Sequence, residues 1–374
     1  VGSLSASKLI LREIGVKLPP RAKTHHILRG LAATKWRLRN VTPASIAALP
    51  DATSVDMQIA LQILTGITGT SFLAEPELYP LITFEGIRLT LLHGVSEGSA
   101  ECFAGFAAVL VSGLFDVAGG RRIVDVAKAL LIGPGRAQRV HRIAAAEAIF
   151  VLPWERPLAE SVEALFDAQR AANEQGDTAY AAIAGPAGCF HALVAGQELE
   201  ALEAVLTRQL AASERTRHRH SEGDVHRQLA FVRCLRGTSA SPTRMAGPHY
   251  DEDADLHEQE SAGAKNSASA LAWYQGRLAL TFGDHARAKE RSARALADVS
   301  AHQGTQLTPQ IWFLHAIAHL RDDQLGSSRK ALSILRGMER AVPTSFGHLA
   351  DLVAAERARV RGNANEAARF YELA

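Results

Sequence analysis

The chain has 374 residues, of which 47% are hydrophobic and 21% charged, a composition typical of folded globular proteins. Its 41 basic and 39 acidic side chains leave a net charge of +2, so the basic excess typical of nucleic-acid-binding proteins is missing. The longest apolar run, residues 102–115, is shorter than the roughly 20 residues that a bilayer-spanning helix needs. We therefore expect neither nucleic acid nor a membrane as a partner.

The three cysteines, Cys102, Cys189 and Cys234, are far apart and form no C-x-x-C pair. This spacing argues against a disulfide framework or a structural zinc site, and it favours a reducing, cytoplasmic environment.

The first part of the chain differs from the rest. Residues 9–40 are rich in lysine and arginine, and a Pro-Pro turn at residues 19–20 precedes an amphipathic helical pattern. We expect residues 1–70 to form an N-terminal helical cap or lead-in. The chain starts at Val1 and stops at Ala374 inside a helical pattern, which suggests a segment of a longer protein.

Helical periodicity dominates the remainder. Leu199, Leu202 and Leu206, for example, fall on one helical face. Glycine- and proline-containing turns separate such stretches, and no segment shows a train of short strands. The sequence predicts an all-α fold.

One stretch, residues 273–296, resembles a tetratricopeptide unit of two helices. Gly276 occupies the small position of the first helix, and Gly283-Asp284 forms the turn. Ala288 and Ala295 occupy the small positions of the second helix. A small residue lets two helices approach closely, a turn glycine permits positive φ, and an aspartate can cap the second helix.

Weaker copies of this pattern recur along the chain. Gly362 with Ala367, and Gly196 with Ala201, repeat the turn and the small position that follows it. The resulting turns are about 40 residues apart, with one longer step, which is within the range of helical solenoids; they lie near residues 116, 156, 197, 237, 284, 323 and 363. Residues 71–374 are therefore predicted to form a right-handed α-solenoid of degenerate tetratricopeptide-like helix pairs. The longer step contains an acidic insertion at residues 250–255, predicted to be an exposed loop.

Three further stretches carry a family resemblance. They are residues 74–82 with 88–94, residues 154–158 with 176–181, and residues 354–362. With them the chain resembles the helical region of large bacterial and fungal signalling proteins. Those proteins combine a serine/threonine kinase-like domain, a STAND-class AAA-type ATPase, this helical region, and often GAF and histidine kinase modules. The resemblance implies a regulatory role without catalytic residues in this segment.

Short motifs offer catalytic alternatives. Residues 94–98 match G-x-S-x-G, but a hydrolase elbow needs a preceding strand, and residues 84–93 have a helical pattern. We expect Gly94 to end that helix and Ser96 or Ser99 to cap the next one. The S-x-x-K matches at residues 5–8 and 327–330 lack their partner motifs, and no phosphate-binding loop sequence occurs, so we expect no cofactor in this segment.

Histidines form the richest group of possible metal ligands. His218, His220 and His226 lie close to Glu222 and Asp224, but Gly223 argues against one unbroken helix and neighbouring arginines would repel a cation. We predict a polar loop between helices, with no metal. The pair His315/His319 and the four tryptophans are interpreted as helix-face or packing residues, although one tryptophan could instead anchor a peptide.

These observations favour a non-catalytic region that binds a protein segment or an effector on its concave face. Its partner would be a protein or peptide, including neighbouring ATPase or kinase domains of the same chain. A stand-alone peptide-binding scaffold is the main alternative, and a helical serine hydrolase using Ser96 is a remote one.

Overall fold

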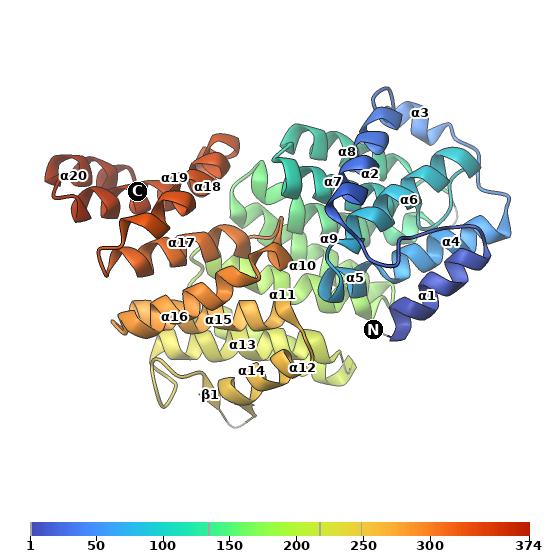
Figure 1. Cartoon of the computed structure of the whole chain (residues 1–374). Coiled ribbons are helices and arrows are strands. Elements are labelled where there is room, and N and C mark those ends of the chain that lie inside the picture. Colours follow the sequence, from blue (N-terminus) through green and yellow to red (C-terminus); the bar gives the residue numbers. More distant parts are fainter. Residues whose placement is uncertain (1, 134, 217, 248) are drawn as a thin grey trace. The chain divides into compact units, whose positions relative to one another are not determined.

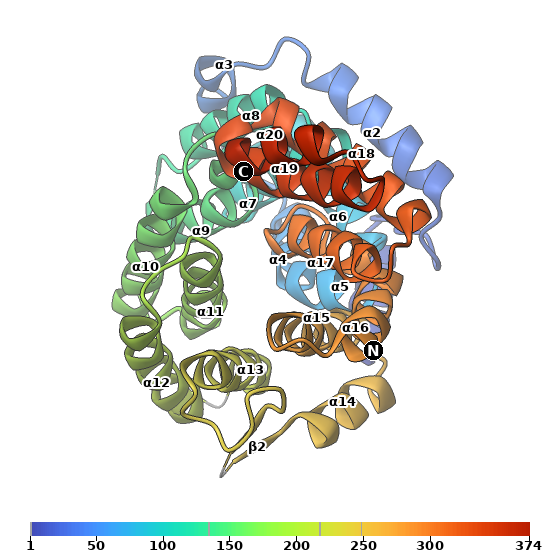
Figure 2. The ribbon, with the colours of Figure 1, turned by 90° about the vertical axis from the view of Figure 1, so that its left-hand side faces the viewer.

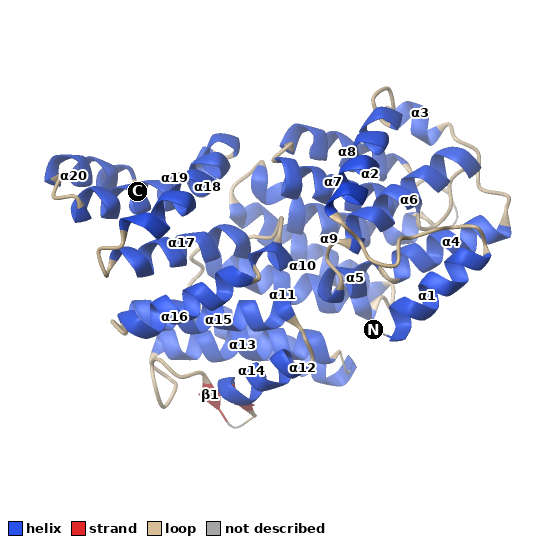
Figure 3. Ribbon diagram, in the orientation of Figure 1, coloured by secondary structure: helices blue, strands red, loops and turns tan. Residues whose placement is uncertain are grey.

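The computed structural model describes residues 2–133, 135–216, 218–247 and 249–374, with the side chains of residues 2, 3 and 72–74 left out. Within these ranges the chain forms twenty α-helices, three short 3-10 helices and one two-stranded ribbon (Figures 1 and 3). The predicted all-α class is confirmed. Among the described helices, none combines the length and the apolar character needed to cross a bilayer.

The chain divides into two compact units, residues 1–151 and 152–374. In unit 1, helices α2 and α4 pack on α6, and α3 packs on α8. The N-terminal helices thus share a core with the first long helix pair, α6 and α7. The boundary expected at residue 70 falls inside α5 instead of between units. The helices of unit 1 are α1 (Gly2–Glu13), α2 (Thr24–Arg37), α3 (Pro43–Ala47), α4 (Val55–Gly66), α5 (Thr68–Ala74), α6 (Leu78–His93), α7 (Ser99–Leu114), α8 (Val117–Ala129) and α9 (Val140–Phe150).

Glycines set the close helix contacts of unit 1. A Cβ at Gly86 on α6 would lie 2.2 Å from the Sγ of Cys102 on α7, and one at Gly30 on α2 would lie 2.5 Å from the Phe84 ring. Such approaches are possible only without a side chain. These two glycines therefore permit the short distances at which α2 and α7 pack on α6.

Unit 2 consists of a series of helices joined mostly by short turns. Neighbours in sequence pack against each other, most extensively in the pairs α10/α11, α12/α13, α15/α16, α17/α18 and α19/α20. Its elements are η2 (Leu152–Trp154), α10 (Leu158–Glu174), α11 (Thr178–Val194), α12 (Leu199–Thr216), α13 (Arg219–Arg236), β1 (Ala246–Gly247), β2 (Tyr250–Asp251), α14 (Glu252–Ser261), α15 (Lys265–Thr281), α16 (His285–Ala297), η3 (Val299–His302), α17 (Leu307–Leu320), α18 (Leu325–Ala341), α19 (Pro343–Val360) and α20 (Ala364–Leu373).

Alternate helices of unit 2 form a layer of their own. Helix α11 packs on α13, α13 on α15, α15 on α17, and α17 on α19. Figure 2 shows α11 and α13 on the inner side of the curve made by α10 and α12, and α15 inside α16. We call α11, α13, α15, α17 and α19 the inner layer.

The first element of unit 2 contacts residues that come much later in the same unit. The indole Nε1 of Trp154 donates to the carbonyl of Gly304 at 3.3 Å, and the Trp154 ring lies 4.8 Å from that of Phe346 on α19. Trp154 is buried, which agrees with its interpretation as a packing residue. Unit 2 therefore coils far enough for its first element to touch α19.

The acidic insertion is folded, which corrects the predicted exposed loop. Residues 246–247 pair with residues 250–251 in the β1–β2 ribbon, residues 252–261 form α14, and the Glu252 side chain is fully buried. Glu252 accepts hydrogen bonds from Met245 N at 3.0 Å and from the Arg287 guanidinium at 2.5 Å. Glu252 and Asp255 of the insertion pair with Arg287 and Arg227, which are distant in sequence, and this pairing holds the insertion against the helices.

Candidate functional site

The small residues predicted for the repeat lie in a helix–helix seam. Ala288 and Ala295 on α16 are fully buried. A Cβ at Gly276 on α15 would lie 3.1 Å from Leu314 Cδ2 on α17 and 3.2 Å from Arg291 Cβ on α16. At Gly276, α15 thus lies close to both α16 and α17, and this seam supports the inner layer.

The predicted turns show the expected local geometry. Gly283 has φ +84° and Gly362 has φ +78°. The Asp284 carboxylate accepts from Arg287 N at 3.0 Å, and Asn363 accepts from Glu366 N at 3.2 Å. Six of the seven predicted turn positions lie in connections between helical elements, and the one near residue 237 lies between α13 and β1. Ala367, four residues after Asn363, is buried like Ala288.

One predicted small position is displaced by a residue. Gly196 has φ +78°, but Ala201 is exposed and Leu202 is buried in its place. The turn contains one extra residue, so Glu198 caps α12 by accepting from Ala201 N at 2.6 Å. Leu202 N then bonds to Glu198 O as Ala288 N bonds to Asp284 O, and Leu202 is the true counterpart of Ala288.

Aromatic side chains concentrate on the inner layer. The Trp273 and Tyr274 rings of α15 lie 5.7 Å and 6.4 Å from Phe190 of α11. They also lie 5.9 Å and 5.0 Å from Phe231 of α13. These contacts join three successive helices of the inner layer.

Arg277 lies one turn after Trp273 on α15. Its guanidinium carbon is 5.7 Å from the centre of the Phe313 ring on α17. Burial lowers the pKa of Arg277, and within the described part of the chain no carboxylate pairs with it. An unpaired, partly buried guanidinium beside an aromatic ring is suited to a carboxylate from a partner. Sequence reasoning missed Arg277 because its lack of an acidic neighbour is a tertiary property.

Several buried polar atoms of unit 2 also have no hydrogen-bond partner among the described residues. They include Trp273 Nε1 on α15, Gln228 Oε1 on α13 and His302 Nε2 on η3. Burial lowers the pKa of His302 to about 4, so this ring is neutral near pH 7. Unsatisfied buried polar atoms are costly, and here they mark the part of unit 2 with unused hydrogen-bonding capacity.

The G-x-S-x-G stretch lacks the context of a hydrolase elbow. Helix α6 precedes it, and Gly94 with φ +100° ends that helix as predicted. The expected N-cap is wrong, because Gly98 holds that position. Ser99 instead accepts from Ser96 N at 3.0 Å and bonds to Thr90 Oγ1 at 2.9 Å. The strand that exposes the nucleophile in such elbows is replaced by a helix.

A serine–histidine pair occurs elsewhere, between α10 and α11. Ser161 Oγ and His191 Nδ1 are 2.8 Å apart, and both residues are buried. Burial lowers the pKa of His191 to about 3. Because the pair lies inside the helix–helix seam, it stabilises packing and is not placed to meet a substrate.

The histidine-rich stretch is helical, which corrects the predicted loop. Helix α13 continues through Gly223, and Asp224 bonds to Arg227 at 2.7 Å. Across the described ranges, no three histidine, cysteine or acidic side chains converge as metal ligands. Packing of α13 on its neighbours outweighs the cost of about 1 kcal/mol that glycine imposes on a helix.

His315, His319 and the cysteines lie in packed positions, whereas Trp36 is 67% exposed, which corrects its interpretation as a packing residue. His315 and His319 are buried on α17 with ring centres 4.3 Å apart. The three cysteines are buried and free, and burial raises the pKa of Cys189 to about 12. In the two S-x-x-K matches, Lys8 binds Glu75 at 2.8 Å and Lys330 lies over the Trp312 ring.

No protein-family model matches the chain, and no curated protein matches it in sequence.

Proposed function

We propose that this chain is a right-handed α-solenoid of degenerate tetratricopeptide-like helix pairs that binds a protein segment. It would act in the cytoplasm as a non-catalytic, regulatory region of a multidomain STAND-type ATPase or kinase signalling protein. The proposal joins the sequence resemblance to the helix pairing in unit 2. In this proposal the segment contributes binding and coupling, while neighbouring domains carry out the chemistry.

The observation that carries the proposal is the continuous inner layer. Each inner-layer helix contacts the following inner-layer helix, which is two helices further along the chain. Helices α12, α16 and α18 lie between them in sequence and pack on the inner layer. Repeat arrays have this nearest-neighbour arrangement, and they present extended surfaces along one layer. The close approach at Gly276 and the buried Ala288 and Ala295 support the tetratricopeptide-like part of the proposal.

Arg277 indicates the chemistry of the bound segment. An unpaired guanidinium over Phe313 favours a carboxylate flanked by apolar side chains. Buried arginines and aromatic residues are the groups that most often dominate binding energy at interfaces. An acidic, partly apolar segment of an adjacent domain would satisfy both requirements.

The reading frame on both sides of residues 1–374 provides the first test. Kinase, P-loop or histidine kinase motifs there would support the signalling role, and their absence would favour the stand-alone scaffold. The encoded flanking segments should then be purified separately and titrated into this chain by calorimetry.

Arg277→Glu should weaken that binding by at least about tenfold, because it places two like charges at the contact. Arg208→Glu is the matched control, since Arg208 is exposed on α12, outside the inner layer. Equal affinities of the two variants would contradict the placement of the binding surface on the inner layer.

A further inference from the structure

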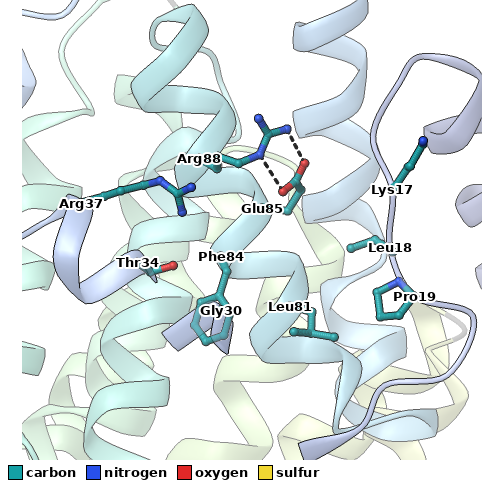
Figure 4. Close-up of a pocket in the computed structure, with 10 residues that line it drawn as sticks. All are labelled: Lys17, Leu18, Pro19, Gly30, Thr34, Arg37, Leu81, Phe84, Glu85 and Arg88. Atoms are coloured by element: carbon teal, nitrogen blue, oxygen red, sulfur yellow. Dashed lines mark hydrogen bonds and ion pairs between the residues drawn. The ribbon is translucent and has the colours of Figure 1, made fainter. Parts of the chain in front are cut away.

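A small pocket lies within unit 1. Its volume is about 170 Å³, comparable to the space that about six water molecules occupy in the liquid. Three segments line it: the connection after α1, helix α2 and helix α6 (Figure 4). It is therefore large enough for a small organic group.

One side of the pocket is apolar. Leu81 and Phe84 of α6 are buried there, and Leu18 lies across from them in the connection after α1. Gly30 lets α2 approach the Phe84 ring closely. These residues offer a surface for a hydrocarbon or aromatic group.

A buried hydroxyl with no partner lies on the α2 side. Thr34 is fully buried, and its Oγ1 makes no hydrogen bond to any described residue. Other helical threonines of this chain donate to the carbonyl four residues earlier, as Thr65, Thr68, Thr90 and Thr281 do. Figure 4 shows the Thr34 oxygen directed toward the pocket. An unsatisfied buried hydroxyl is unfavourable, and a ligand oxygen would satisfy it.

The charges around the pocket are mostly positive. Arg88 is held by Glu85 through bonds of 2.6 Å and 2.9 Å. Arg37 and Lys17 make no ion pair with any described residue. Figure 4 shows the Arg37 guanidinium extending from α2 toward Glu85 and Arg88. With the Glu85 carboxylate already paired, the two remaining cations favour an anion.

We propose that this pocket binds a small amphiphilic oxyanion, a carboxylate or phosphate attached to an apolar group. The oxyanion would accept from the Arg37 guanidinium and the Thr34 hydroxyl, while the apolar group packs on Phe84 and Leu81. Lys17 adds charge at the rim. This site is independent of the protein-binding surface proposed for unit 2.

Calorimetric titration of the whole chain at low salt with benzoate, phenyl phosphate and neutral benzamide tests the proposal. Benzoate or phenyl phosphate should bind at least about tenfold more tightly than benzamide, because charge-assisted bonds are the stronger ones. The tighter of the two anions identifies the preferred oxyanion. Equal binding of benzamide, or no saturable binding of either anion, would overturn the proposal.

Variants on α2 provide the second arm. Arg37→Gln should weaken binding of the preferred anion about tenfold, and Thr34→Val should weaken it severalfold without lowering the thermal midpoint of the free protein, because it removes an unsatisfied hydroxyl. Arg29→Gln, an exposed position on the same helix outside the pocket, should change nothing. If Arg37→Gln and Arg29→Gln bind the anion equally, the site is not where we place it.

Discussion

Substituting Gly276 by alanine tests the packing of the seam between α15, α16 and α17. In an exposed helix this change stabilises by about 1 kcal/mol through helix propensity. At Gly276 the new Cβ would lie 3.2 Å from Arg291 Cβ and 3.4 Å from Ser292 N. These atoms belong to or adjoin the backbone of α16 and cannot move alone. Overpacking of this kind costs about 1–3 kcal/mol, so we expect a net destabilisation of up to about 2 kcal/mol.

Gly337→Ala is the matched control. Gly337 lies inside α18, and its added Cβ would have no atom within 4 Å. Only the propensity gain remains, so this variant should be about 0.5–1 kcal/mol more stable than the parent. Urea unfolding followed by tryptophan fluorescence reports mainly on unit 2, where Trp154, Trp273 and Trp312 lie. If Gly276→Ala unfolds at the same or higher urea concentration than Gly337→Ala, the seam is not closely packed.

Three further changes test other parts of the account. Asp284→Ala removes the cap on Arg287 N and should lower the unfolding free energy by about 1 kcal/mol in urea titrations; an unchanged midpoint would contradict the cap. Asp255→Asn weakens the pairing of the buried Arg227, which Asp255 contacts at 2.8 Å through both oxygens, and should cost up to about 3 kcal/mol. It should also speed tryptic cleavage within residues 239–264, and a parental digestion rate would refute this anchoring role. The folded-state pKa of His191 is about 3, below its ordinary value near 6.5. As pH falls, the His191 imidazole is therefore protonated in the unfolded chain before it is protonated in the folded chain. Its stabilising contribution is complete above pH 6.5 and is lost toward pH 3, by at most about 1.4 kcal/mol per pH unit. His191→Gln should flatten the acid limb of stability between pH 6.5 and 4, whereas His285→Gln, an exposed control, should not.

Features set by neighbours in sequence were predictable. The positive φ of Gly283 and Gly362 and the cap made by Asp284 depend on two or three adjacent residues. The burial of Ala288 follows from its distance to that cap. The same local reasoning misplaced Ala201, because one extra residue in the turn moved the cap to Glu198 and the buried position to Leu202.

Features that depend on distant residues were not predictable from one sequence. The acidic insertion folds because Glu252 meets Arg287, 35 residues away in sequence, and Asp255 meets Arg227, 28 residues away. The division into units follows from the packing of the N-terminal helices on α6. Thr34 is a candidate only because its surroundings offer its hydroxyl no partner, and no local pattern reports that.

Hydrogen–deuterium exchange most directly tests the proposal that a protein segment binds on the inner layer. The chain should be compared alone and when saturated with any flanking segment for which calorimetry detects binding. We predict new protection on the inner layer, strongest around residues 273–281 of α15 and 311–314 of α17, with little change on α12 and α18. Protection confined to α12 and α18, with exchange on α15 and α17 unchanged, would contradict binding on the inner layer.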